Sequence, residues 1–152
     1  MNTVSGDLLR LALEGRFDVI VHGCNCMCAM GAGIAKQIKA TFPEAYAADC
    51  QTEAGDRGKL GSISHACVER DGRTVTVVNG YTQYHWKGPE GGADYEAIRR
   101  VMRAVKQQFA GGRIGYPKIG AGLAGGDWTI IAAIIEEELA GLDHTLVEYA
   151  AA

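Results

Sequence analysis

The chain has 152 residues, a length that predicts one domain, residues 1–152, rather than two. Hydrophobic residues make up 47% of it and charged residues 22%, and the formal net charge is -3. This composition excludes a disordered chain, a collagen and a coiled coil, and the charge predicts no direct, sequence-specific binding of nucleic acid.

The first predicted elements are a strand and a helix. Residues 17–22 (FDVIVH) form a β-branched run between two glycines, which is typical of a strand buried on both faces. The next apolar residues recur every four positions and predict a helix; they are Ile34, Ile38 and Phe42. Pro43 either ends this helix or begins a second one, with Tyr46 and Cys50 on its inner side.

A hairpin and a long helix follow. Residues 61–68 and 74–78 are predicted strands, and Asp71-Gly72 between them is a turn signal because glycine tolerates the positive φ that hairpin turns need. Residues 94–109 predict the clearest helix, ended by Gly111-Gly112. Its apolar positions, three or four residues apart, are Tyr95, Ile98, Met102, Val105 and Phe109.

The last part of the chain predicts two more strands around a helix. Residues 113–117 form a short strand, and residues 144–149 form a final one. Between them Asp127 caps a helix whose inner face is Ile131, Ile134, Ile135 and Leu139. Helices that alternate with strands predict an α/β sandwich with a largely parallel sheet and one antiparallel hairpin.

Neither a membrane helix nor a signal peptide is expected. No apolar run approaches the roughly 18 residues of a membrane span, and residues 1–14 lack a basic start and a cleavage site. Five cysteines, an odd number, then predict reduced thiols and a cytoplasmic location.

Three of the cysteines, Cys24, Cys26 and Cys28, alternate after His22. Their spacing differs from that of structural zinc ligands, and no second ligand pair follows. Small hydrophobic side chains at the end of a strand are therefore favoured over a metal site. We expect neither a metal nor another cofactor.

The glycines cluster in two segments that each follow a predicted strand and precede a helix, residues 23–33 and 120–126. At such places backbone N–H groups and helix N-termini bind phosphate, so the two loops can hold the two phosphates of a pyrophosphate. There is no P-loop. Gly120-x-Gly122-x-x-Gly125 matches the dinucleotide-binding fingerprint only formally, because it lies late in the chain without the acidic residue expected about 20 positions on. Tight turns between packed elements are the alternative.

Four segments, in their order and spacing, resemble the macro domain, a module that binds ADP-ribose. They are Gly6-Asp7-Leu8, Val21-His22-Gly23-Cys24-Asn25, Met30-Gly31-Ala32-Gly33-Ile34-Ala35 and Pro117-Lys118-Ile119-Gly120-Ala121-Gly122-Leu123. The resemblance covers essentially the whole chain and implies a three-layer α/β/α sandwich with a mixed, mostly parallel central sheet. It is closest to the branch of ADP-ribose 1″-phosphate phosphatases and terminal ADP-ribose glycohydrolases. The partners it implies are ADP-ribose or its derivatives and ADP-ribosylated macromolecules.

The resemblance also implies roles for individual residues. Asp7 would accept a hydrogen bond from the adenine amino group, although it also suits the cap of a helix that begins at Leu8. Tyr149 would pack on the adenine face, or else take part in ordinary core or edge packing. Asn25 would hydrogen-bond the distal ribose, or else belong to a loop turn. The remaining ligand-binding residues are Leu8, Met30, Gly31, Ala32, Gly33, Ile34, Ile119, Gly120, Ala121, Gly122 and Leu123.

In the related glycohydrolases a lysine that follows the strand equivalent to residues 74–78 attacks C1″ of the distal ribose, and an acidic residue after the G-x-G-L segment assists. This sequence has Tyr81-Thr82-Gln83 near the first position and Ala124 at the second. Lys87 lies further along the loop. The resemblance therefore does not extend to a covalent lysine mechanism.

A phosphatase-like or water-mediated route remains, with His22, Asp127 and Asn25 as candidate catalytic residues. Asp127 would act as base or acid, and His22 would protonate a leaving phosphate or stabilise its charge. The alternatives are a helix cap for Asp127 and a hydrogen-bonded histidine at a strand end for His22. Residues 84–86 (YHW) form either a lid over the ribose or a solvated loop. Three hypotheses follow: a hydrolase acting at C1″, a non-catalytic module that reads or sequesters ADP-ribose, and a metal or redox protein built on the cysteines.

Overall fold

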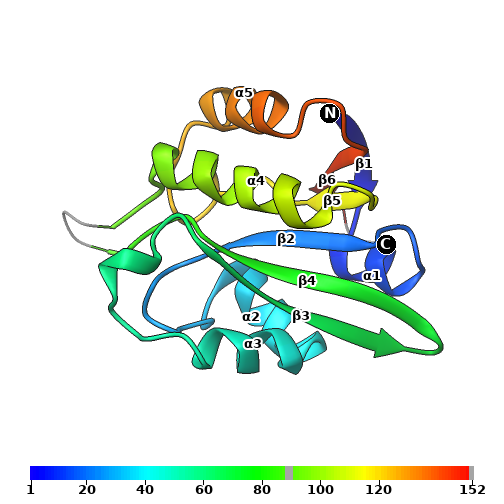
Figure 1. Ribbon diagram of the computed structural model, residues 1–152, viewed down its shortest axis with the longest axis horizontal. Helices are drawn as coiled ribbons and strands as arrows, with labels where there is room; N and C mark the ends of the chain where they lie inside the picture. Colours follow the sequence, from blue (N-terminus) through cyan, green and yellow to red (C-terminus); the bar gives the residue numbers. More distant parts are fainter. Residues whose placement is uncertain (88–90, 151–152) are drawn as a thin grey trace.

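The computed structural model describes residues 1–87 and 91–150, and its strands form one six-stranded sheet (Figure 1). The strands are β1 (Asn2–Gly6), β2 (Val19–Cys24), β3 (Ile63–Arg70), β4 (Arg73–Tyr81), β5 (Ile114–Tyr116) and β6 (His144–Tyr149). They lie in the order β1-β6-β5-β2-β4-β3, and every neighbouring pair is parallel except β3 with β4. The predicted mixed, mostly parallel sheet with one antiparallel hairpin is confirmed.

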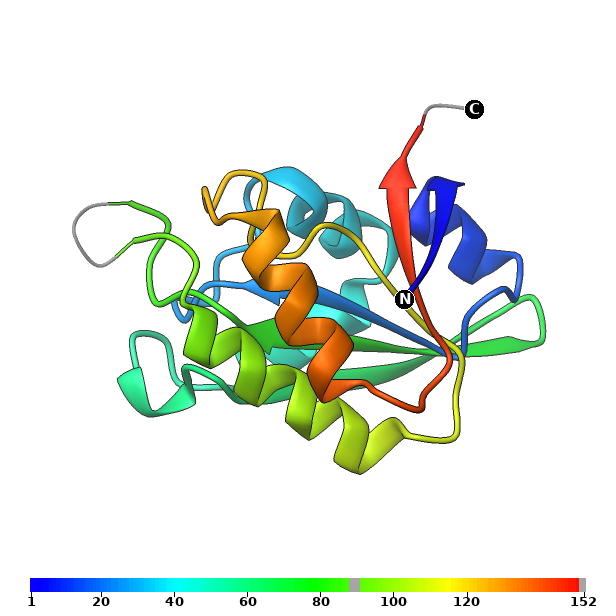
Figure 2. The ribbon, with the colours of Figure 1, turned by 90° about the horizontal axis from the view of Figure 1, so that it is seen from above.

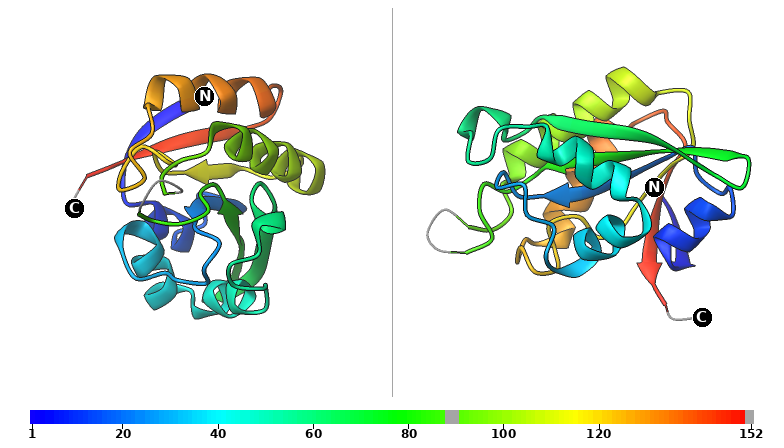
Figure 3. Two further views of the ribbon diagram at one scale, coloured as in Figure 1. Left: turned by 90° about the vertical axis from the view of Figure 1, so that its left-hand side faces the viewer. Right: turned by 90° about the horizontal axis from the view of Figure 1, so that it is seen from below.

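Helices cover both faces of the sheet. They are α1 (Leu8–Leu13), α2 (Gly33–Thr41), α3 (Pro43–Cys50), α4 (Tyr95–Phe109) and α5 (Trp128–Glu138), with a short 3-10 helix, η1, at Arg57–Lys59. In Figures 1 and 2, α4 and α5 lie alongside each other over one face. Figure 3 shows α2 and α3 below the sheet, so the three-layer sandwich is confirmed. Within the described ranges, none of the helices is long and apolar enough to cross a membrane.

Side chains that alternate along β2 divide the core in two. Val19 and Val21 pack toward α4 and α5, in a cluster that includes Ile98. Ile20, between them, points to the opposite face and shares a cluster with Ile38 of α2. A central parallel strand with both faces covered buries every side chain, which explains the unbroken apolar run in the sequence.

The predicted hairpin turn and the predicted cap of α5 are present, and α4 is capped in the same way. Asp71 and Gly72 have φ values of 52° and 76°, as a two-residue hairpin turn with positive φ at both positions requires. The carboxylates of Asp94 and Asp127 accept backbone N–H groups in the first turns of α4 and α5. These caps fix where both helices begin.

Pro43 begins a second helix, since it lies in the first turn of α3, where its missing N–H has no intrahelical partner to lose. Tyr46 faces inward as expected, since it is half-buried and packs against the buried cluster around Tyr81. The same expectation was wrong for Cys50, which is exposed. The buried polar residue of this helix is Asp49. It accepts a hydrogen bond from the Tyr81 hydroxyl group over 2.7 Å, which allows a carboxyl group on the inner side.

The sequence did not indicate β1. Its five residues, NTVSG, are mostly exposed and have no apolar alternation. The strand is defined by its parallel pairing with β6, in which Gly6 lies opposite Tyr149. Pairing with a neighbour can impose a strand on residues whose own preference is weak. The pairing of β1 with β6 brings the start of α1 to the carboxyl end of β6.

β4 continues to Tyr81, three residues beyond the predicted end of the strand. Asn79 is an unusual strand residue, but it is wholly buried and its amide donates to Ala45 O at 2.9 Å and to Ser64 Oγ at 3.0 Å. The carboxyl ends of the parallel strands β2, β4, β5 and β6 consequently share one edge of the sheet.

Candidate functional site

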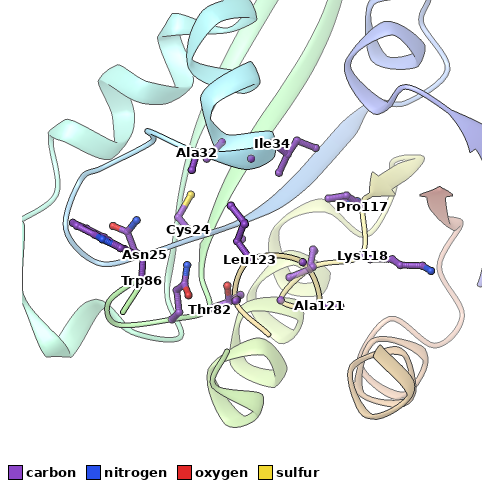
Figure 4. A pocket seen from close by; sticks show the side chains of 18 of the residues that line it. Cys24, Asn25, Ala32, Ile34, Thr82, Trp86, Pro117, Lys118, Ala121 and Leu123 are labelled. Carbon is purple, nitrogen blue, oxygen red and sulfur yellow. The ribbon is translucent and has the colours of Figure 1, made fainter. Parts of the chain in front are cut away.

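A cavity of about 870 Å³ opens at the carboxyl ends of β2 and β5. Its walls are the loop between β2 and α2, the start of α2, and the loop between β5 and α5 (Figure 4). The chain leaves β2 toward β4 on one side and later returns to β5 on the other. Open α/β sheets bind ligands at this kind of reversal, and the volume suits a small molecule.

The start of α2 forms one wall. Gly31, Ala32, Gly33 and Ile34 line the cavity there. The cap residue, Ala32, offers no side-chain acceptor to the N–H groups of the first turn, which leaves them to a ligand. A helix N-terminus also carries a partial positive charge, so this wall suits an anion such as a phosphate.

The loop after β5 forms the facing wall. It lines the cavity with Ile119, Gly120, Ala121, Gly122 and Leu123. The loop is closed by a 2.7 Å hydrogen bond from Gly126 N to Gly120 O, and a Cβ on Gly126 would lie 2.6 Å from that oxygen. Leu123 is 81% exposed and reaches toward α2, where a Cβ on Gly33 would lie 3.3 Å from Leu123 Cδ1. The two glycine loops thus approach each other across the cavity.

One end of the cavity carries Tyr149, which is 73% exposed. Tyr149 also lines a neighbouring hollow of about 500 Å³, and Asp7 lines this second hollow. Asp7 Oδ1 accepts the N–H groups of Leu9 and Arg10 at 3.0 and 3.1 Å. Asp7 therefore caps α1, while its second carboxylate oxygen is not used in the cap.

The opposite end is lined by amide and hydroxyl side chains, those of Asn25, Thr82 and Gln83. Asn25 Oδ1 accepts from Met27 N at 2.9 Å, and Asn25 Nδ2 donates to Ala29 O at 2.8 Å. These contacts are those of a loop turn, the alternative role expected for Asn25. Because an amide nitrogen carries two hydrogens, Asn25 keeps one for a ligand.

An aromatic pair borders this end. Trp86 is 50% exposed and lines the cavity, close to Asn25 in Figure 4. Its ring stacks on that of His85, with the centroids 4.0 Å apart and the planes at 28°. Gly92 N donates to His85 O over 3.2 Å, which fixes the base of the loop. Of the aromatic loop, Trp86 therefore faces the cavity.

His22 is not brought into the cavity wall. Its side chain is wholly buried behind Cys24, and its Nε2 donates to Asn79 Oδ1 over 2.7 Å. The Cys24 Sγ atom lies 3.7 Å from His22 Nδ1. Burial lowers the pKa of His22 to about 4, so the imidazole is neutral at neutral pH and is a poor proton donor. The contacts match the alternative of a hydrogen-bonded histidine at a strand end.

Asp127, Leu8 and Met30 also lie outside the walls of both hollows. Asp127 Oδ1 accepts from Thr129 N at 2.9 Å, which matches the helix-cap alternative. Leu8 is buried in the core beneath α1, and Met30 is buried in a cluster with Tyr81. Side chains enclosed by core partners have no surface left for a ligand.

Thr82 and Gln83 line the wall directly after β4, in the segment that the family resemblance places near C1″. Sequence reasoning missed Lys118 and Glu148 as ligand-lining residues. Lys118 and Glu148 lie on neighbouring strand ends, with Lys118 Nζ 3.9 Å from Glu148 Oε1. Their proximity depends on the pairing of β5 with β6, which no local pattern reveals.

The cysteines behave as packed thiols. Cys24 and Cys26 are buried, and burial raises the pKa of Cys26 to about 11 and that of Cys24 well above its usual value. Both are therefore protonated and unreactive at neutral pH. Cys28 donates its thiol to Asp49 O over 3.2 Å. Across the part of the chain that the structure describes, no three or more His, Cys, Asp or Glu side chains are grouped to hold a metal ion.

The chain is similar in sequence to one protein family and to several known proteins. The family model of the Macro domain matches residues 21–135. An uncharacterised 17.5 kDa protein from the tk-vs intergenic region of Enterobacteria phage T4 is 36% identical over 153 residues, which cover 96% of this chain and 94% of that protein. The ADP-ribose glycohydrolase OARD1 of Bos taurus is 30% identical, over 96% of this chain and 88% of that protein.

A longer relative is the DNA ADP-ribosyl glycohydrolase of Mycobacterium tuberculosis. It is 32% identical over 127 residues, which cover 82% of this chain but 34% of that protein. The chain therefore spans about a third of the length of this relative. Among solved structures, the macrodomain of Thermus aquaticus DarG superposes with a TM-score of 0.72 and 26% identity, over 99% of this chain and 97% of that one.

Proposed function

Because the chain belongs to the macro domain family, we propose that its cavity binds ADP-ribose and that the protein hydrolyses the bond between C1″ of the distal ribose and an attached group. The observation that carries the proposal is the pair of facing glycine loops at the uncapped start of α2. A helix N-terminus opposite a second loop of backbone N–H groups suits a pyrophosphate.

The proposed pose follows from the two different ends of the cavity. The pyrophosphate lies between the loops of residues 31–34 and 119–123. The adenine stacks on Tyr149 and reaches toward Asp7 in the second hollow. The distal ribose, which is rich in hydroxyl groups, then faces the amide and hydroxyl side chains beside Asn25. This orientation directs C1″ toward Trp86 and the bulk of any conjugate toward solvent.

The chemistry is supported by the relatives named as glycohydrolases. We place no covalent lysine step here: Gln83 lines the wall at the end of β4, and Lys118, a lysine of the cavity wall, lies toward the adenine end. The route proposed is direct attack by water. The bond from the water oxygen to C1″ forms, the bond from C1″ to the leaving group breaks, and that group departs with its electron pair while the proton of the water passes to solvent. Such a route suits leaving groups that bear negative charge well, such as phosphate.

The first test is a calorimetric titration of the protein with ADP-ribose, ADP and AMP. Binding of ADP-ribose much more tightly than of the other two supports the site. The second test incubates the protein with ADP-ribosylated DNA, ADP-ribosylated protein and ADP-ribose 1″-phosphate and measures release of ADP-ribose. The substrate that is turned over identifies the leaving group. Absence of ADP-ribose binding would overturn the proposal.

A non-catalytic reader or sequestering module is the second candidate. One observation favours it. Among the described residues that line the cavity, Glu148 is the one with a carboxylate, and it belongs to β6 at the adenine end. No carboxylate of these residues lies beside Asn25, where the reaction would take place. Tight binding of ADP-ribose together with no release from any of the three substrates would select this candidate.

The location is proposed as the cytoplasm. The proposal rests on the odd number of cysteines and on their free thiols in the structure, which suit a reducing compartment. Fractionation of cells that produce the protein tests it.

A further inference from the structure

Gln83 carries an unsatisfied polar atom in the cavity wall. Among the described residues, one buried side-chain nitrogen or oxygen atom has no hydrogen-bond partner, and it is Gln83 Oε1. Gln83 lines the cavity. Leaving a buried acceptor unpaired is costly, so such atoms in native proteins commonly mark a place where something else binds. This oxygen is thus open to a hydrogen-bond donor that enters the cavity, such as a hydroxyl group of a ligand.

The backbone around Gln83 is held on both sides. The N–H groups of Thr82 and Gln83 both reach Cys24 O, at 3.1 and 3.4 Å, and Thr82 O accepts from Asp94 N at 2.9 Å. These contacts tie the segment to β2 and to the start of α4. The side chain thus leaves a backbone that is held on both sides.

Gln83 shares its end of the cavity with Asn25. Asn25 retains a free amide hydrogen, whereas Gln83 retains a free carbonyl oxygen. A donor and an acceptor at one end of a pocket match a group that both accepts and donates hydrogen bonds. Ribose hydroxyl groups do both. ADP ends at the pyrophosphate, which the proposed pose holds between the glycine loops, so ADP presents no hydroxyl group to Gln83.

We infer that Gln83 Oε1 accepts a hydrogen bond from a hydroxyl group of the distal ribose and thereby selects ADP-ribose over nucleotides that end in a phosphate. The inference rests on the proposed function, because it assumes that ADP-ribose occupies the cavity. It makes Gln83 a specificity-determining residue. An amide does not titrate, so Gln83 presents the same acceptor at every pH between about 5 and 9.

The test measures the affinities of wild type, Gln83→Met and Gln83→Glu for ADP-ribose and for ADP by calorimetry. Methionine keeps the length of the side chain and removes the acceptor, so Gln83→Met weakens ADP-ribose binding by roughly tenfold and leaves ADP binding unchanged. Glutamate keeps an acceptor and adds charge, so Gln83→Glu retains more ADP-ribose affinity than Gln83→Met and binds ADP less well than wild type. Gln107→Met, on the exposed side of α4, is the matched control and binds both ligands as wild type does.

The outcomes separate this inference from the proposed function. A wild-type protein that does not bind ADP-ribose overturns both. A wild-type protein that binds ADP-ribose, with a Gln83→Met variant that loses affinity for both ligands equally or for neither, overturns the inference alone. Thermal unfolding of each variant shows whether the fold is kept, and Gln83→Glu provides a second reading if Gln83→Met does not fold.

Discussion

Gly122 is a position where a side chain would have room in the fold but not in the complex. A Cβ there meets no atom within 4 Å, and the residue lines the cavity. We predict that Gly122→Glu leaves the fold intact and weakens ADP-ribose binding by more than about 100-fold, because it adds bulk and negative charge where the pyrophosphate approaches. Calorimetry measures the affinity and thermal unfolding the stability.

The matched control is Gly111→Glu, just beyond the end of α4. A Cβ at Gly111 also meets no atom within 4 Å, and the residue is exposed away from the cavity. This variant should bind ADP-ribose as wild type does. Equal affinities of the two variants would show that the loop around Gly122 does not hold the pyrophosphate.

His22 predicts a pH dependence of stability. The folded protein keeps its imidazole neutral down to a pKa of about 4, whereas the unfolded chain takes up a proton near pH 6.5. Because the unfolded state binds more protons between these values, the free energy of unfolding falls as the pH falls from about 6.5 to about 4. The group is fully buried, and the total loss is about 3 kcal/mol below pH 4.

Chemical denaturation of wild type and His22→Gln at several pH values isolates this contribution. Glutamine can still donate to Asn79 but does not titrate, so the variant should lose the part of the slope between pH 6.5 and 4 that belongs to His22. Identical slopes in the two proteins would mean that the imidazole is not held neutral in the folded state.

The same histidine shows why single site residues are hard to predict from sequence. His22 and Cys24 are two positions apart on β2, so they point to the same side of the sheet. Only Cys24 reaches the cavity. The neighbouring loops determine how far the cavity extends along β2. His22 lies below its floor and is hydrogen-bonded to Asn79 of β4. The sequence near His22 contains none of this information.

At the scale of elements, prediction succeeded where several local signals coincided. The helices α4 and α5 combine a capping aspartate with apolar residues at helical spacing, and β6 ends where expected. β1 and the end of β4 were missed because their conformation depends on other parts of the chain. β1 is a strand because it pairs with β6, and Asn79 fits in β4 because its amide donates to buried acceptors. Tertiary contacts there override a weak local preference.

The cap of α5 tests whether Asp127 is structural. We predict that Asp127→Ala lowers the free energy of unfolding by about 1 kcal/mol, because it removes the acceptor for Thr129 N. ADP-ribose affinity and turnover should change by less than about twofold, since the side chain does not line the cavity. Asp127→Asn, which keeps a capping oxygen, should retain most of the stability. A large loss of turnover in both variants, with binding unchanged, would restore a catalytic role.

At the scale of the whole molecule, the site is assembled from distant parts of the chain. The two glycine loops were predictable as one site, because each follows a parallel strand and the carboxyl ends of such strands share an edge. The polar end was predictable only through the family resemblance: it joins residues after β2 and β4, such as Asn25 and Gln83, with the aromatic Trp86 of a long loop. That grouping follows from the strand order β5-β2-β4, and the sequence determines this order only through the complete fold.

This assembly predicts that the ligand stabilises the folded protein as a unit. In the proposed pose ADP-ribose contacts the loops after β2, β4 and β5 and the end of β6, so it joins both halves of the sheet and has no site on the unfolded chain. At a free concentration 100 times Kd it should stabilise the fold by about 2.7 kcal/mol, which raises the unfolding midpoint by roughly 5–10 °C in a domain of this size. Thermal unfolding with ADP-ribose, ADP and AMP measures the shift. Gly111→Glu should keep it and Gly122→Glu should lose it, because binding to the folded state is its only source; an equal shift in both variants would place the ligand at another site.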